Sequence, residues 1–174
     1  MNSSIKHLAK KISKKILGVP DARQFFNGFH TNIRKKIYRE KFNTEKLLIF
    51  LDEFGIRKGD TIFVPSSWRE FYNFEGNPKD LISSLIEILG NQGNLAMPSN
   101  TSLFSDNLLF DVKKTPTNAG LLAEYFRRTK GVKRSIHLNS SICVFGPDAE
   151  EITSSHEKSI TSWDEFSPPH KLYK

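Results

Sequence analysis

Three short apolar runs, each followed directly by a residue that breaks a strand, set the strongest limit on the fold of this chain. They occupy residues 61–64 before Pro65, residues 93–97 before Pro98, and residues 142–145 before Gly146 and Pro147. β-Branched and aromatic residues favour strands, and proline ends a strand because it has no N–H to donate. The sequence therefore predicts three short strands, the first of them buried.

Amphipathic segments alternate with these runs. Residues 44–54 carry leucines at helical spacing, with Asn43 or Thr44 as the cap, and Asn77-Pro78 is typical of a helix start. Further helices are expected after Thr117, as an N-cap, and over residues 148–156. The alternation predicts an α/β fold with a largely parallel or mixed sheet and helices on both faces.

Positive charge is concentrated at the N-terminal end. The 174 residues hold 26 Lys and Arg against 19 Asp and Glu, a net charge of +7. Residues 1–41 contain 11 of the basic residues and two acids, so they carry +9, and residues 42–174 carry −2. We therefore divide the chain into a basic arm, residues 1–41, and a nearly neutral body, residues 42–174, which has no bias toward nucleic acid.

The basic arm is predicted to be helical. Ile5, Leu8, Ile12 and Ile16 repeat at helical spacing among lysines, and a second basic stretch over residues 33–42 continues the pattern. Docking of the apolar stripe on the domain itself or on a partner subunit is the favoured reading. Peripheral contact with anionic lipid stays open, as does a homodimer.

Several classes of protein are excluded by composition. No run approaches the 18 apolar residues of a membrane-spanning helix, and no signal peptide is visible, so a cytoplasmic location is expected. The single cysteine, Cys143, excludes a disulfide framework, and no residues show metal-ligand spacing, so no metal is expected. Phosphate-loop, dinucleotide-binding and serine-hydrolase motifs are absent.

Four short polar segments lie at predicted strand ends or in loops, where functional sites concentrate. They are residues 64–67, 97–99, 115–120 and 134–137. Taken singly, each is more typical of a turn, a cap or a solvated charge than of a ligand site.

Their order and spacing resemble the aminoglycoside 3-N-acetyltransferase family. The matching stretches, in chain order, are residues 54–56, 59–60, 65–67, 93–98, 110–111, 115–116, 120–127 and 134–137, then Ser141, Gly146, His156 and Ser167-Pro168. Pro65 stands where the family has histidine, and Leu138 where it has proline. The resemblance extends over roughly residues 44–172.

The resemblance implies transfer of an acetyl group from acetyl-CoA, as co-substrate, to an amino group of an aminoglycoside or related amino sugar. It makes Ser66, Ser67, Arg134, Ser135 and His137 the candidates for binding CoA. The general base of the family is expected beyond Lys174, so the catalytic residues are not assigned. On this reading the chain is the N-terminal part of an acetyltransferase domain, truncated at its C-terminal end.

A second hypothesis follows from the same comparison. Pro65 removes a titratable ring from the first loop, and general-base catalysis typically contributes 10²–10⁴-fold to a rate. The alternative function is therefore a catalytically inactive member of the family, or a module that binds CoA or a surface.

Overall fold

The structure is a computed structural model that describes residues 37–101 and 110–173. The chain divides into two compact units, Met1–Lys41 and Phe42–Lys174. The helix predicted over residues 5–16 lies outside the described residues. Residues 38–41 are not helical, so the helix predicted over residues 33–42 does not reach Phe42, which forms a bridge with Phe74 instead.

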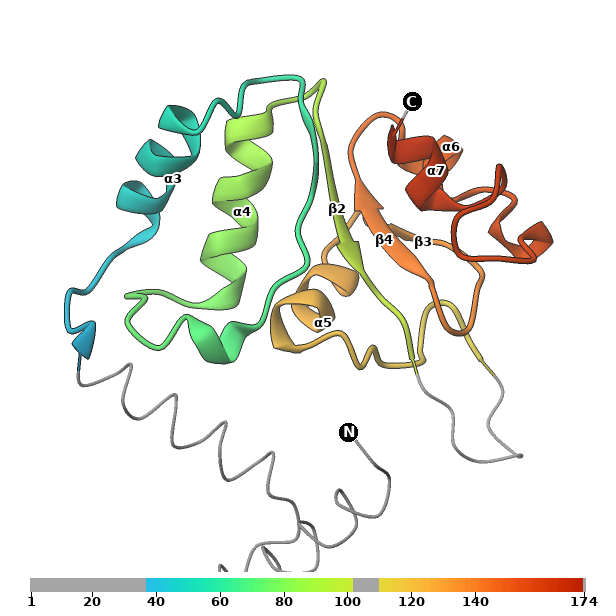
Figure 1. The fold of residues 1–174 in the computed structure, drawn as a ribbon, viewed down its shortest axis with the longest axis horizontal. Coiled ribbons are helices and arrows are strands. Elements are labelled where there is room, and N and C mark those ends of the chain that lie inside the picture. Colours follow the sequence, from blue (N-terminus) through green and yellow to red (C-terminus); the bar gives the residue numbers. More distant parts are fainter. Residues whose placement is uncertain (1–36, 102–109, 174) are drawn as a thin grey trace, which may run out of the picture. The chain divides into compact units, whose positions relative to one another are not determined.

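The second unit alternates helices and strands (Figure 1). In chain order its elements are α3 (Thr44–Glu53), β1 (Thr61–Phe63), the 3₁₀ turn η1 (Trp68–Glu70), α4 (Pro78–Leu89), β2 (Asn94–Pro98), α5 (Leu121–Arg127), β3 (Lys133–Arg134), β4 (Ile142–Phe145), α6 (Ala149–Thr153), the 3₁₀ turn η2 (His156–Lys158) and α7 (Pro168–Tyr173). The predicted α/β class is therefore confirmed.

The described strands form one four-stranded sheet in the order β1-β2-β4-β3. β1 and β2 are parallel, whereas β4 is antiparallel to both of its neighbours. The mixed form of the prediction is thus correct and the largely parallel form is wrong. The reason is that β3 and β4 are consecutive and joined by residues 135–141, so they pair as a hairpin.

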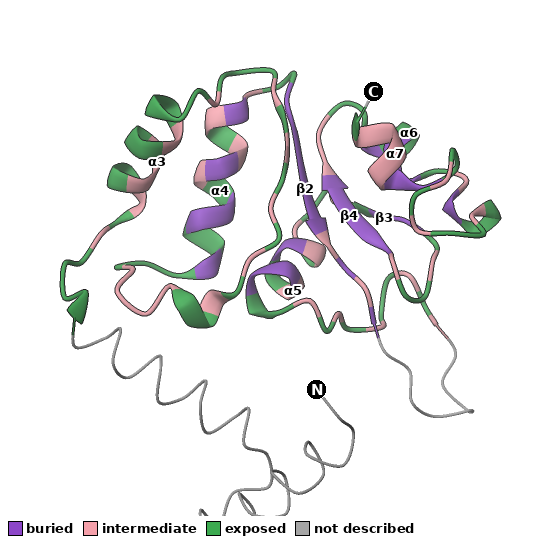
Figure 2. Ribbon diagram, in the orientation of Figure 1, coloured by how far each residue is buried: buried purple, intermediate pink, exposed green. Residues whose placement is uncertain are grey.

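The buried residues of the sheet lie along β2 and β4 (Figure 2), and they belong to two hydrophobic clusters, one on each face. Leu95, Met97 and Cys143 face α4 and α5, and Ala96 and Val144 face the other way, toward α6. This separation follows from the alternation of side chains along a strand. α3 packs on α4, so it forms an outer layer.

The best-specified helix is α4. The Asn77 side chain accepts hydrogen bonds from the backbone N–H groups of Lys79 and Asp80, and Pro78 occupies the first turn. Leu81, Leu85 and Leu89 are all buried, at the spacing that places them on one side of the helix.

Three local predictions need correction. β1 is not buried, because it pairs only with β2 among the described strands, and Phe63 is 45% exposed. Thr117 does not cap α5, which begins after Gly120; its hydroxyl donates to the Asn100 carbonyl at 2.8 Å. The predicted helix over residues 148–156 is divided into α6 and η2.

Candidate functional site

The polar segments predicted from the sequence meet at one end of the sheet. β3 is antiparallel to β4, which is antiparallel to β2, so β1, β2 and β3 run in the same direction. Their C-terminal ends, followed by Ser66, Ser99 and Ser135, therefore share an edge with the start of β4. The candidate site therefore lies at this end of the sheet, since ligands bind outside the carboxyl ends of strands in such folds.

The five predicted CoA-binding residues are divided between two strands at this end. Ser66 and Ser67 follow β1, whereas Arg134, Ser135 and His137 belong to β3 and the loop after it. β1 and β3 are the two outer strands of the sheet, three strand spacings or roughly 14 Å apart. The structure thus brings the five to one end but not together, and their contact with CoA stays a prediction.

Arg134 is buried and its guanidinium is occupied within the protein. It donates to the carbonyl oxygens of Ser99 at 2.5 Å, Thr115 at 2.6 Å and Val112 at 3.3 Å, and its Nε donates to Ser141 Oγ at 3.4 Å. These bonds use four of the five N–H groups that a guanidinium offers. Arg134 therefore joins β3 to the segments after β2 and before α5.

A chain of hydrogen bonds passes from Ser135 through His156 and Ser140 to His137. His156 is fully buried, and its Nδ1 lies 2.8 Å from Ser135 Oγ while its Nε2 lies 3.4 Å from Ser140 Oγ. Ser140 Oγ also lies 2.8 Å from Nδ1 of His137, whose ring stacks on that of His156 with centroids 4.6 Å apart.

The partners in this chain limit where the protons lie. Ser135 Oγ accepts the Ile142 N–H, and it can either donate to His156 Nδ1 or accept from it, according to the tautomer of His156. His137 Nδ1 accepts the Ser140 N–H and therefore carries no proton. Ser140 Oγ can donate its hydrogen to His137 Nδ1 or to His156 Nε2, and it accepts at most one hydrogen bond from these rings, so at least one of its two lone pairs stays free.

Electrostatics agree with a neutral His156. Burial is the main cause that lowers the pKa of His156 to about 4, and the neighbouring His137 acts in the same direction, so the His156 ring is uncharged near pH 7. A buried neutral ring with both nitrogens bonded to serines is suited to positioning Ser140 rather than to taking a proton from a substrate.

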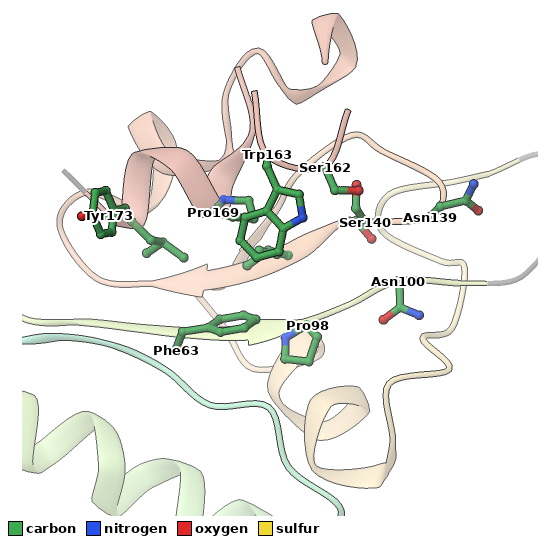
Figure 3. A pocket seen from close by; sticks show the side chains of 12 residues that line it. Phe63, Pro98, Asn100, Asn139, Ser140, Ser162, Trp163, Pro169 and Tyr173 are labelled. Atoms are coloured by element: carbon green, nitrogen blue, oxygen red, sulfur yellow. The ribbon is translucent and has the colours of Figure 1, made fainter. Parts of the chain in front are cut away.

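Ser140 opens onto a pocket of about 400 Å³ on the α6 and α7 side of the sheet (Figure 3). Phe63 and Pro98 lie on one side of it, and Trp163, Pro169 and Tyr173 on the other. The remaining lining residues are Asn100, Asn139, Ser141, Ile142, Ser162 and Leu172. The pocket thus combines aromatic and aliphatic walls with a group of hydroxyls and amides, which suits a ligand with an apolar body and a few polar groups.

None of the five predicted residues lines this pocket. Sequence reasoning missed Ser140, and it missed the aromatic residues Trp163 and Tyr173 because the hydrophobic pattern fades after residue 157. A signal was present in the polar run Asn139-Ser140-Ser141, which directly precedes β4.

The part of the chain that the structure describes contains neither a metal-binding cluster nor a membrane-spanning helix. No group of three or more His, Cys, Asp or Glu side chains could hold a metal ion. No helix within residues 37–101 and 110–173 is long and apolar enough to cross a membrane.

Comparison with known proteins identifies relatives of this fold and sequence. A sequence model of the aminoglycoside 3-N-acetyltransferase family matches residues 63–174. Aminoglycoside N(3)-acetyltransferase IV of a Salmonella species is 36% identical over 102 residues, which cover 58% of this chain and 38% of that protein.

Solved structures agree. Aminoglycoside acetyltransferase AAC(3)-IVa, solved as the apoenzyme and in a mutant complex with gentamicin, has a TM-score of 0.69 and 30% identity, over 77% of this chain and 51% of that chain. AAC-IIIb, solved as a binary complex with CoASH, shares the fold with a TM-score of 0.67 at 22% identity, over 76% of this chain and 56% of that chain. The chain spans about half the length of the relatives that it matches, or less.

Proposed function

Because the chain belongs to the aminoglycoside 3-N-acetyltransferase family, we propose that it forms part of a site that transfers acetyl from acetyl-CoA to an amino group of an aminoglycoside or related amino sugar. One observation carries the proposal. Every residue that lines the 400 Å³ pocket falls within residues 63–174, the stretch that the family matches. The gentamicin complex of the relative AAC(3)-IVa supports a small amine as acceptor.

The apolar walls and the few polar groups of the pocket suit acetyl-CoA, which is a thioester. Acetyl-CoA supplies an activated acyl group on a slender arm that alternates methylene groups with amides. The walls near Phe63, Trp163 and Tyr173 offer apolar contact for such an arm. The free lone pair of Ser140 Oγ offers an acceptor for an amide N–H, and Asn100 and Asn139 can donate to carbonyls.

In the proposed reaction the acceptor nitrogen attacks the thioester carbonyl carbon. The C–N bond forms, the C–S bond breaks, and the proton lost by the amine balances the thiolate of CoA. His156 does not take this proton, because burial keeps its pKa near 4 and serines bind both of its nitrogens. Its part is to hold the hydroxyl of Ser140 with the lone pair toward the pocket.

Release of the free CoA thiol tests this function. The full chain is incubated with acetyl-CoA alone and with gentamicin, apramycin or glucosamine, and thiol is followed with a chromogenic disulfide. Because the general base of the family is expected beyond Lys174, we expect release to be slow and to occur only when an amine is present. The preferred amine separates an antibiotic acceptor from a simple amino sugar. A chain that binds acetyl-CoA but releases no thiol with any amine would instead be a CoA-binding, inactive member of the family.

A further inference from the structure

A second pocket, of about 600 Å³, lies beside β3 and the C-terminal end of α5. Every charged residue that lines it is basic: Lys113, Lys114, Arg127, Arg128, Lys133 and Arg134. Arg134 pairs with Cys143 in the sheet and so lies on the α4 and α5 face, opposite to the first pocket. We call this the basic pocket.

Nearby acids neutralise only part of this charge. Glu124 accepts two hydrogen bonds from Arg127, of 2.9 and 2.7 Å, and one from Arg128, of 2.7 Å. Glu150 pairs with Lys133 at 2.8 Å, but both side chains are more than half exposed, so the pair is weak.

Asp111 is the third acid near the basic pocket, and its carboxylate binds backbone N–H groups. Its carboxylate accepts the N–H groups of Lys113 and Lys114 at 2.8 and 2.9 Å. Among the described residues, neither lysine ammonium forms an ion pair. Six basic residues against three acids leave a net charge of +3 around the basic pocket.

Two of the cations are held where water cannot screen them well. The Arg127 side chain is 5% exposed and Arg134 is 9% exposed. Burial lowers the pKa of Arg134, and the like charge of Arg127 acts in the same direction. A positive potential from buried guanidinium groups, together with the exposed Lys113 and Lys114, attracts and holds an anion.

We infer that the basic pocket binds a phosphate-type oxyanion, either free or as part of a nucleotide. Ammonium and guanidinium groups form short, charge-assisted hydrogen bonds to phosphate oxygens. The volume lies within the range of about 300–1,000 Å³ that is usual for small-molecule pockets, so a phosphate ester fits as well as a free ion. The inference goes beyond the proposed function, which uses only the 400 Å³ pocket on the other face of the sheet. Arg134, one of the residues predicted to bind CoA, lines the basic pocket instead.

Isothermal titration of the full chain at low salt tests this, with inorganic phosphate, ADP and adenosine as probes. We expect saturable binding of phosphate or ADP, weakened as salt is added, and no binding of adenosine. Tighter binding of ADP than of phosphate identifies a nucleotide as the source, and equal binding identifies the free ion. Binding of adenosine as tight as that of ADP would overturn the inference.

Charge-matched variants locate the site. The double variant Lys113→Ala/Lys114→Ala should bind at least ~10-fold more weakly. Lys113→Arg/Lys114→Arg should retain binding. The control Lys79→Ala/Lys158→Ala removes the same charge from exposed positions elsewhere and should bind as the wild type does. All four lysines are exposed, so the variants are expected to fold, which circular dichroism checks. Equal affinity of the Lys113→Ala/Lys114→Ala and control variants would contradict the assignment.

Discussion

Ser140 is the residue on which the proposed binding mode depends most. His137 and His156 fix its hydroxyl, and its remaining lone pair is the acceptor offered to a ligand. In Ser140→Ala we expect acetyl-CoA to bind about 3- to 10-fold more weakly, the usual worth of one hydrogen bond. Titration calorimetry measures this, with Ser154→Ala as an exposed control outside the pocket. An unchanged affinity of Ser140→Ala for acetyl-CoA would show that Ser140 Oγ does not accept a hydrogen bond from the ligand.

His156 should make stability depend on pH. Its pKa is about 4 in the folded chain against an ordinary value of 6.5, so the unfolded chain binds more protons between these values. Its contribution is therefore complete above pH 6.5 and is lost as pH falls toward 4. Between pH 7.5 and 5.0 we expect a loss of about 2 kcal/mol in the free energy of unfolding, measured by urea titration. His156→Gln should lack this dependence; an equal loss in the variant and the wild type would assign it to other groups.

Arg134 should stabilise the fold through the hydrogen bonds of its guanidinium, and not through its positive charge alone. Lysine keeps the charge but cannot reach three carbonyls and a hydroxyl at once, so Arg134→Lys leaves buried acceptors without donors. We expect a loss of about 2–4 kcal/mol in the free energy of unfolding, measured with urea. Arg128→Lys, at an exposed position with one bond to Glu124, should cost less than about 1 kcal/mol. Similar losses in the two variants would exclude the structural role.

At the scale of elements, the turn after β4 depends on a glycine. Gly146 has φ of 140°, and a Cβ there would lie 2.8 Å from Asn94 Cα and closer still to the Gly93 carbonyl. Gly146→Ala must therefore move the turn after β4 away from Gly93 and Asn94. We expect a loss of more than about 2 kcal/mol, measured by thermal unfolding. Gly59→Ala is the control, because φ is 90° but nothing lies within 4 Å, so only about 1 kcal/mol of backbone strain is expected. Equal losses would show that contact with Asn94 is unimportant.

Elements with strong local signals could be predicted from the sequence. α4 has a cap, a proline and a periodic leucine face, and β2 and β4 are apolar runs, so all three are found where expected. β3 has only two residues and no apolar pattern, so nothing local indicates it. The exposure of β1 also could not be predicted, because burial of a strand depends on what pairs and packs beside it.

At the scale of the whole molecule, the sequence indicated which end of the sheet holds the candidate site, but it did not identify the residues that line the pocket. Strand ends identify one end of the sheet, and Ser66, Ser99, Ser135 and Ser140 all lie there. The pocket also needs Trp163 and Tyr173, which reach it through the path of the chain after η2, and no local pattern encodes that path. Arg134 is a residue that the sequence did single out, as a CoA-binding candidate. In the structure its guanidinium donates to carbonyl oxygens of the protein.

Binding of acetyl-CoA to the full chain is the most direct test of the central claim that this chain contributes a CoA pocket of an acetyltransferase. Titration calorimetry should show one saturable site with a dissociation constant between about 1 μM and 1 mM, the usual range of substrate affinities. The same titration with Ser140→Ala should show the weaker binding predicted above. Absence of binding heat at about 1 mM acetyl-CoA, in a chain shown to be folded, would contradict the claim.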